Sequence, residues 1–149
     1  MLIWVCALHC EAKPVIDFYR LKKSHAETAF DLYQGDKMAC IISGTGKIAS
    51  AAATAWAAAK FNDEPVVWIN LGIAGAAEHP VGSIFLVTQV IDPDSGQNYY
   101  PVTVTSSSLD TISCISLNQP SLDYHPRHLF DMEASGFFDS ALRFSTAEL

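Results

Sequence analysis

Two carboxylates stand beside apolar segments, where they could act on a bound ligand. Glu11 comes soon after the apolar run Leu2–Leu8, and Glu133 follows Met132 close to the C-terminal end. A carboxylate in such a place can take a proton from water as a general base or accept hydrogen bonds from hydroxyl groups. Each also stands where a helix is expected to begin, and the helix dipole alone stabilises a carboxylate there by about 0.3–1 kcal/mol. A catalytic role and a purely structural role both remain open for these two residues.

A glycine-rich segment between a predicted strand and a predicted helix is the next candidate. Residues 42–49 read ISGTGKIA, which fits the G-x-G-x-x-A pattern of dinucleotide-binding turns. Gly44 and Gly46 would let the backbone approach a ligand closely and aim N–H groups at an anion. The acid expected about 20 residues further on would be Asp63 or Glu64, and both precede the next strand, whereas ligands bind where strands end. The alternative is a glycine turn that packs a helix tightly against a sheet.

Length and composition exclude several classes of protein. With 149 residues, 50% of them hydrophobic and 17% charged, the chain is predicted to form one globular domain over residues 1–149. Its net charge of −7 argues against binding to nucleic acid, which requires clustered Lys and Arg. The apolar run at the N-terminus is too short to span a membrane and lacks the basic start of a signal peptide. We therefore expect a soluble, cytoplasmic protein with no nucleic-acid or membrane partner.

The cysteines do not form a metal-binding pattern. All four lie in or beside apolar segments, at Cys6, Cys10, Cys40 and Cys114. No C-x-x-C pair occurs, so we expect buried free thiols, no metal site and no cofactor. His125 and His128 are the nearest spare acid–base groups, and we expect them in a solvated loop.

The spacing of apolar residues predicts strands that alternate with helices. Strands are predicted at 2–8, 28–34, 37–43, 66–71 and 83–91, with weaker signals at 99–105 and 111–117; helices at 11–21, 46–60 and 131–144; and loops at 106–108 and 118–127. Gly35-Asp36 is a hairpin signal, and Asp131 is able to cap the last helix. This order predicts an α/β fold with three layers, α/β/α, around a central mixed β-sheet.

Four segments, taken in order, resemble the nucleoside phosphorylase and nucleosidase superfamily, most closely the 5′-methylthioadenosine/S-adenosylhomocysteine nucleosidases. They are Val5–Glu11, Ser43–Lys47 with the alanine-rich helix after it, Ile69–Gly75 followed by Val81–Val87, and Asp131–Ser135. The resemblance extends from residue 2 to about residue 144 and is weakest between residues 92 and 128. It implies the three-layer fold of that superfamily.

The resemblance also implies roles for individual residues. Glu11 matches the carboxylate that activates the attacking water, and Met132 and Glu133 match the pair that binds the ribose. The segment Ile73-Ala74-Gly75 is implied to lie near the base and the ribose, and the turn Ser43-Gly44 is a further candidate for substrate contact. Cleavage of an N-glycosidic bond passes through an oxocarbenium-like state, whose positive charge is stabilised by anionic groups.

Water, rather than phosphate, is the expected nucleophile. A phosphate site is usually built on arginine, and where related phosphorylases carry that arginine this chain has Asn70. Ile73 stands where the family offers Ser or Thr. The main hypothesis is hydrolysis of the N-glycosidic bond of a purine (thio)nucleoside such as methylthioadenosine or S-adenosylhomocysteine. The alternatives are a non-catalytic nucleoside-binding or interaction domain of the same fold, a phosphorolytic enzyme and, last, a dinucleotide-binding protein.

Two departures from the family bear on the site. The interval from Gly75 to Glu133, which holds the family's base-recognition loop, is shorter here. The family's general acid is an aspartate after a further strand, and neither that strand nor the aspartate precedes Leu149, so the last strand and helix are expected to be missing. Protonation of the leaving group contributes about 10²–10⁴-fold to such reactions. Family members are usually dimers or larger, so a homo-oligomer is expected as well.

Overall fold

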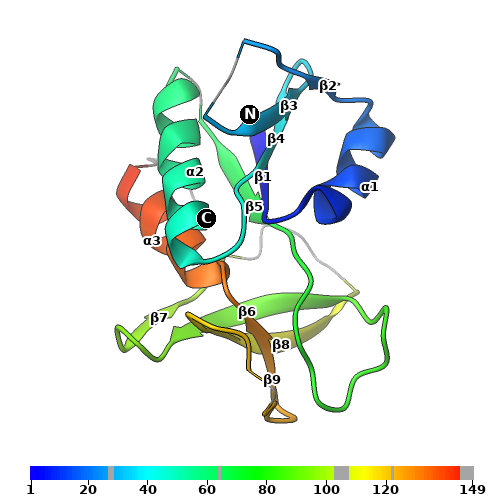
Figure 1. Cartoon of the computed structure of the whole chain (residues 1–149), viewed down its shortest axis with the longest axis vertical. Helices are drawn as coiled ribbons and strands as arrows, with labels where there is room; N and C mark the ends of the chain where they lie inside the picture. The colour runs from blue at the N-terminus through cyan, green and yellow to red at the C-terminus, as the bar shows by residue number, and fades with distance from the viewer. Residues whose placement is uncertain (27–28, 64, 103–107, 122, 145–149) are drawn as a thin grey trace.

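The computed structural model describes residues 1–26, 29–63, 65–102, 108–121 and 123–144. Within these residues the helices are α1 (His9–Tyr19), α2 (Lys47–Lys60) and α3 (Ala134–Phe144). The strands form two hydrogen-bonded sheets. Figure 1 shows the first sheet between α1 on one side and α2 with α3 on the other, and the second sheet below them. The predicted α/β fold with mixed strand directions is confirmed.

The first sheet has the strand order β2-β3-β4-β1-β5. Its members are β1 (Leu2–Cys6), β2 (Lys22–Lys23), β3 (Asp31–Gln34), β4 (Met38–Ile42) and β5 (Val67–Asn70). β1 pairs in parallel with β4 and β5, whereas β3 and β4 form an antiparallel pair. The turn between these two contains Gly35, whose N–H donates to the carbonyl of Met38 over 2.9 Å. The predicted hairpin is therefore confirmed.

Strand β1 is buried on both faces, as its continuous apolar sequence predicts. Ile3 and Val5 are fully buried in a cluster that includes Phe137 of α3 and alanines of α2. Cys6 is fully buried in a second cluster, with Val15 and other apolar residues of α1. Successive side chains of a strand point to opposite faces, so β1 fixes the helices of both outer layers relative to one sheet.

The second sheet has the order β7-β6-β8-β9. Its members are β6 (Phe85–Asp92), β7 (Gln97–Tyr99), β8 (Asp110–Ser116) and β9 (His128–Asp131). β6, β8 and β9 run parallel, and β7 pairs antiparallel with β6. Gly75, in the segment that follows β5, makes an isolated antiparallel bridge to Phe130 of β9. This bridge ties the segment that leaves the first sheet to the second sheet.

Helices α2 and α3 pack closely because α3 carries a glycine at the crossing point. A Cβ atom at Gly136 would overlap the backbone carbonyl of Lys47, the first residue of α2. The same face of α2 presents alanines, so both helix backbones can approach one another. The alanine-rich sequence predicts close packing of α2, whereas the contribution of Gly136 is visible only in the structure.

Several predicted boundaries differ from the structure. β1 ends at Cys6 and α1 begins at His9, so helix α1 starts two residues before the predicted position. The predicted helix over 131–144 begins at Ala134, because residues 128–131 form strand β9. That strand is only four residues long, too short for a clear alternation of apolar and polar residues. The strand predicted at 99–105 is wrong for residues 100–102, because β7 ends at Tyr99; residues 103–105 of this strand and residues 106 and 107 of the predicted loop lie outside the described ones.

The cysteine prediction is correct for three residues and wrong for one. Cys6, Cys40 and Cys114 are buried free thiols, but Cys10 is exposed. Cys10 lies in the first turn of α1, on the side that faces away from the sheet, and the apolar run beside it had suggested burial. Among the described residues, no three His, Cys, Asp or Glu side chains are placed to hold a metal ion. None of the helices in the described part of the chain is long and apolar enough to cross a membrane.

Candidate active site

The carboxylate of Glu11 is fixed at the start of α1. Its Oε2 accepts a hydrogen bond from the N–H of Leu8 over 2.8 Å, and its Oε1 accepts one from the N–H of Ile73 over 2.9 Å. The first contact gives the N–H of Leu8, the residue before α1, a hydrogen-bond acceptor, as the third helical residue does in a capping box. It accounts for the start of α1 at His9, before the predicted position. The second contact joins α1 to the segment that follows β5. Glu11 therefore links the start of α1 to Ile73 in the segment Ile73-Ala74-Gly75, which the resemblance also singles out.

The carboxylate of Glu133 is held from the other side by the start of α2. Its Oε1 accepts the N–H of Gly46 over 2.7 Å, and its Oε2 accepts the N–H of Met132 over 3.2 Å. Gly46 precedes α2 with φ of 96°, a conformation that a residue with a side chain rarely adopts. The N-terminus of α2 thus binds the carboxylate of Glu133, and the helix dipole favours a negative charge at this end. This contact explains the glycine segment without a dinucleotide.

Burial raises the pKa of Glu133, although the hydrogen bonds from Gly46 and Met132 oppose the shift. The nearby negative charges of Asp131 and Glu11 raise this pKa further. Burial also raises the pKa of Asp131. Its Oδ2 accepts the N–H of Ala134 over 2.8 Å, which confirms the predicted capping role, while its Oδ1 is buried with no hydrogen-bond partner among the described residues. The site is therefore a region where negative charges are crowded and partly desolvated.

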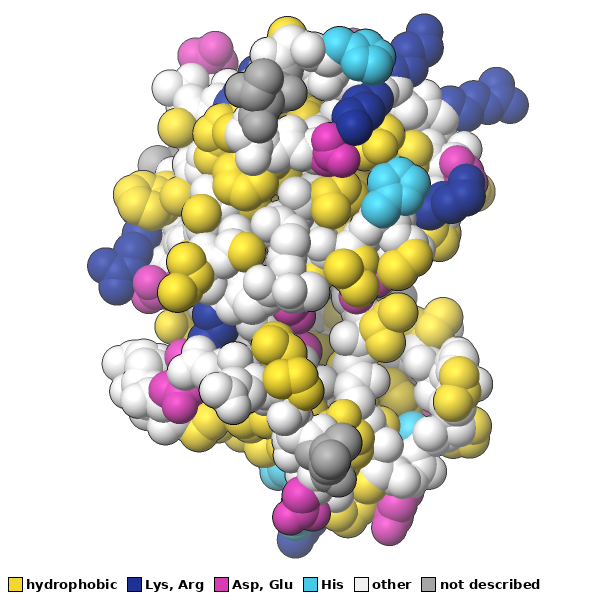
Figure 2. All heavy atoms as spheres, viewed as in Figure 1, with side chains coloured by type: hydrophobic (Ala, Val, Ile, Leu, Met, Phe, Trp, Pro, Cys, Tyr) yellow, Lys and Arg dark blue, Asp and Glu magenta, His cyan; other side chains and the backbone are white. Residues whose placement is uncertain are grey.

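A cleft of about 280 Å³ joins these groups. It is lined by fourteen residues, namely Ala7, Leu8, Glu11, Thr45, Ile73, Leu117, Gln119, Pro120, Ser121, Tyr124, Phe130, Asp131, Met132 and Glu133. Figure 2 shows acidic side chains in a hollow between the part of the molecule built on the first sheet and the part built on the second. The lining contains three carboxylates and no Lys or Arg among the described residues. Such a cleft favours a ligand that carries or develops positive charge, and it disfavours phosphate.

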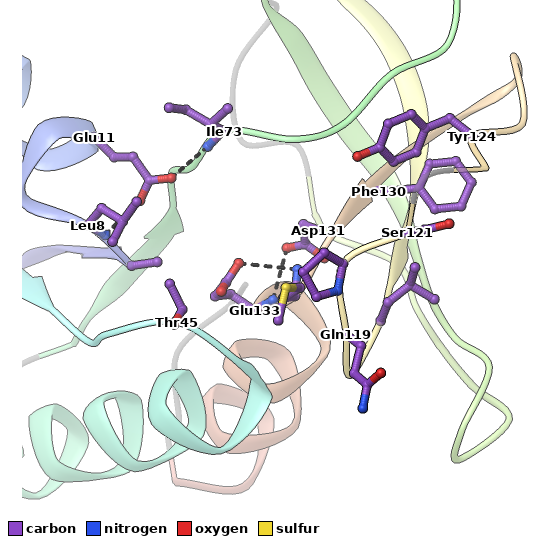
Figure 3. A pocket seen from close by; sticks show the side chains of 14 residues that line it. Leu8, Glu11, Thr45, Ile73, Gln119, Ser121, Tyr124, Phe130, Asp131 and Glu133 are labelled. Atoms are coloured by element: carbon purple, nitrogen blue, oxygen red, sulfur yellow. Dashed lines mark hydrogen bonds between the residues drawn. The ribbon is translucent and has the colours of Figure 1, made fainter.

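The two ends of the cleft differ in chemistry. In Figure 3, Glu11, Leu8 and Ile73 lie at one end, Glu133 lies near the middle, and Tyr124 and Phe130 lie at the other end. The rings of Tyr124 and Phe130 are 5.2 Å apart between centroids, at an angle of 45°. The cleft thus has carboxylates along one part and an aromatic wall along another.

The structure brings four of the predicted site residues together and places the other four beside the cleft. Glu11, Ile73, Met132 and Glu133 line the cleft. Four others are not part of the lining, namely Ser43, Gly44, Ala74 and Gly75. The hydroxyl of Ser43 is buried and donates to the carbonyls of Cys6 and Gly44, and the N–H of Gly44 donates to the carbonyl of Ala7. These contacts attach the glycine turn to the end of β1, which makes Ser43 and Gly44 supports for the cleft wall.

Gly75 supports the aromatic wall. A Cβ atom at this position would lie 2.5 Å from ring atoms of Tyr124, so only glycine leaves room for that ring. The N–H and carbonyl of Gly75 bond to the carbonyl and N–H of Phe130 over 2.8 and 2.9 Å. Both aromatic residues are therefore fixed against the segment that also contains Ile73.

A partly buried ion cluster supports the start of α2. Lys47 Nζ donates to Asp92 and Asp94 over 2.7 Å each, and the side chains of Lys47 and Asp92 are 12% and 11% exposed. Burial lowers the pKa of Lys47, but its hydrogen bonds to the two carboxylates outweigh this and raise it. The cluster joins α2 to the end of β6, and therefore holds the N–H of Gly46 in reach of Glu133.

The two histidines lie outside the lining of the cleft. His128 Nδ1 is 2.6 Å from the hydroxyl of Ser113 on the neighbouring strand, and its ring lies 5.3 Å from that of His125. Thr45, Asp131 and Tyr124 also line the cleft, although their sequence contexts do not predict it. Asp131 precedes the predicted site pair Met132-Glu133, and its position in the sequence predicts only a helix cap. Tyr124 lies in a loop whose sequence contains no periodic signal.

Comparison with known proteins supports the fold. No protein-family model and no curated protein sequence matches the chain. Solved structures do match. The 5′-methylthioadenosine/S-adenosylhomocysteine nucleosidase from Neisseria meningitidis in complex with methylthio-immucillin-A superposes with a TM-score of 0.77 at 19% identity, over 95% of this chain and 79% of that one.

Two further structures extend the comparison. Arabidopsis thaliana 5′-methylthioadenosine nucleosidase gives a TM-score of 0.80 at 17% identity, over 97% of this chain and 77% of that one. A mutant of futalosine hydrolase from Helicobacter pylori gives 0.76 at 12% identity, over 96% and 83%. The chain therefore has the nucleoside phosphorylase/nucleosidase fold that the four sequence segments predict.

Proposed function

We propose that this chain hydrolyses the N-glycosidic bond of a purine (thio)nucleoside such as 5′-methylthioadenosine or S-adenosylhomocysteine. The observation that carries the proposal is the cleft itself, in which Glu11 from one end of the chain meets Met132 and Glu133 from the other. This occurs on a fold shared with methylthioadenosine nucleosidases.

In the proposed mechanism the two glutamates act on different parts of the substrate. Glu133 accepts hydrogen bonds from the ribose hydroxyls, and Met132 packs against the sugar. Glu11 accepts a proton from the water that attacks the anomeric carbon, using a lone pair that its contacts with Leu8 and Ile73 leave free. The carboxylates stabilise the positive charge that develops on the sugar as the bond breaks. The apolar side chains of Leu8 and Ile73 suit the thioether part of the 5′ substituent that these two substrates share.

The lining favours hydrolysis over phosphorolysis. A phosphate nucleophile needs cationic donors, and the described residues that line the cleft include none. Phosphate would also meet three carboxylates there. Water carries no charge and avoids this repulsion.

A second candidate is a nucleoside-binding domain without catalysis. The observation that favours it is that both carboxylate oxygens of Glu11 already accept backbone hydrogen bonds, which is a sufficient structural reason for this residue. A homo-oligomeric state and a cytoplasmic location remain predictions from the sequence. Analytical ultracentrifugation of the purified chain tests the first of these.

A substrate panel tests the proposed function. The purified chain is incubated with 5′-methylthioadenosine, S-adenosylhomocysteine and inosine, with and without inorganic phosphate, and free base is quantified by chromatography. We expect adenine to appear without phosphate. Release of base only in the presence of phosphate would contradict hydrolysis. Binding measured by calorimetry, with no release of base under either condition, would support the second candidate.

A further inference from the structure

Tyr124 occupies a defined position at the aromatic end of the cleft. It is half-buried, its ring packs on the Cβ-free face of Gly75, and it lies at 45° to the ring of Phe130. In Figure 3 its hydroxyl points away from its own loop and across the cleft, toward the end that holds Ile73 and Glu11. No hydrogen bond from this hydroxyl to another described residue is present. An oriented O–H donor therefore faces the space between the aromatic wall and the carboxylates.

The hydrolysis proposed above requires such a donor. When the bond between the sugar and the purine breaks, its electron pair passes to the base, and a hydrogen bond or proton at a ring nitrogen stabilises the leaving group. The other acidic groups in the cleft are poorly placed for this task. Glu11 and Glu133 are assigned to the water and the ribose, and Asp131 Oδ1 is a buried atom while Oδ2 caps α3.

The remaining hydroxyls in the lining are weaker candidates. Ser121 donates to the carbonyl of Asp123 over 3.0 Å, so its proton is already engaged. Thr45 lies near Glu133, at the opposite side from the aromatic wall (Figure 3). A phenol is also a much stronger acid than an aliphatic alcohol, with an ordinary pKa of about 10.

We propose that Tyr124 is the hydrogen-bond donor, and the acid, for the departing purine. This inference rests on the proposed hydrolysis. The C1′–N9 bond breaks and its electrons pass to the base, while the oxygen of water forms the new bond to C1′. Tyr124 donates its phenolic proton to N7 of the base, and Glu11 takes one proton from water. Solvent then moves the proton gained by Glu11 back to the tyrosinate, so the cycle consumes only water.

The test compares two substrates in the full chain and in Tyr124→Phe, which keeps the ring and removes only the hydroxyl. One substrate is 5′-methylthioadenosine, whose base needs protonation. The other is a 4-nitrophenyl riboside, whose leaving group, 4-nitrophenolate, departs as a stable anion near neutral pH. We expect kcat for methylthioadenosine to fall by about 10²–10⁴-fold with little change in KM, and kcat for the nitrophenyl riboside to change little. Tyr19→Phe, which removes a hydroxyl from the exposed end of α1, is the matched control and is expected to leave both rates unchanged.

Each outcome decides the inference. An unchanged kcat for methylthioadenosine in Tyr124→Phe overturns it, and so does an equal loss on both substrates, which would mean a structural role for the hydroxyl. In both cases the proposed function stands, because wild-type protein still hydrolyses the nucleoside. If wild-type protein hydrolyses neither substrate while its thermal melt shows a folded chain, the proposed function fails and the role of Tyr124 fails with it. A selective loss on methylthioadenosine supports both.

Discussion

The two glutamates of the cleft are positioned in different ways. Glu11 accepts its shorter hydrogen bond, of 2.8 Å, from the N–H of Leu8 three residues before it, and a second, of 2.9 Å, from the N–H of Ile73. Glu133 accepts its shorter hydrogen bond, of 2.7 Å, from the N–H of Gly46 far away in the sequence, and a longer one, of 3.2 Å, from its neighbour Met132. Burial raises the pKa of Glu133, and the neighbouring carboxylates add to the shift. Both glutamates are singled out in the sequence, but the main hydrogen-bond partner of Glu133 is set by the packing of segments far apart in the chain.

The largest effect is expected from Glu11→Gln. If Glu11 activates water, kcat for methylthioadenosine should fall by about 10²–10⁴-fold, because an amide is not a base. Binding of the nucleoside, measured by calorimetry, should change little. The control is Asp17→Asn on the same helix, which removes an exposed carboxylate paired with Lys13. Full activity of Glu11→Gln would show that this residue is only a helix cap.

Gly136→Ala tests the close packing of α2 against α3, the helix that follows Glu133. The added methyl group would overlap the Lys47 carbonyl, so α2 and α3 must separate, at a cost of about 1–3 kcal/mol in the free energy of unfolding. Urea denaturation measures this cost. The control is Ala52→Leu at an exposed position of α2, expected to change stability by about 0.5 kcal/mol or less. A stability of Gly136→Ala equal to that of wild type would refute the close crossing.

Glu133→Ala should weaken ribonucleoside binding by about tenfold to a hundredfold, because hydrogen bonds to a charged group are stronger than neutral ones. Calorimetric titration with methylthioadenosine measures the change. Asp139→Ala, which removes an exposed carboxylate paired with Arg143 on the same helix, is the control. Retained affinity in Glu133→Ala would exclude this residue from the ribose site.

The smallest effect concerns pH. Burial raises the pKa of Asp131 in the folded protein, so the folded state holds this proton more tightly than the unfolded state. The contribution of Asp131 to the free energy of unfolding is therefore greatest at pH values below its ordinary pKa of about 3.9, the value in the unfolded chain. This contribution is lost as pH rises through the higher pKa of Asp131 in the folded protein. Asp131→Asn keeps an oxygen for the helix cap and should flatten this part of the pH dependence of unfolding. An identical pH profile in wild type and variant would contradict the shift.

Local sequence signals determined much of the architecture. The apolar run of β1, the hairpin at Gly35 and the alanine-rich α2 were all predicted, because each depends on residues close together in the chain. The capping role of Asp131 is local as well, whereas the roles expected for Glu11 and Glu133 come from the resemblance to the nucleosidases.

Tertiary structure alone decided the rest. The short strand β9 and the Tyr124 ring on Gly75 have no local signature, because partners distant in the sequence create them. The glycine turn shows the difference most clearly. Its sequence predicts an anion-binding helix N-terminus, and that prediction is correct in kind, but only the packing of α3 against α2 reveals that the anion is Glu133. Periodicity and capping act over a few residues, whereas a cleft is made where segments far apart in the chain meet.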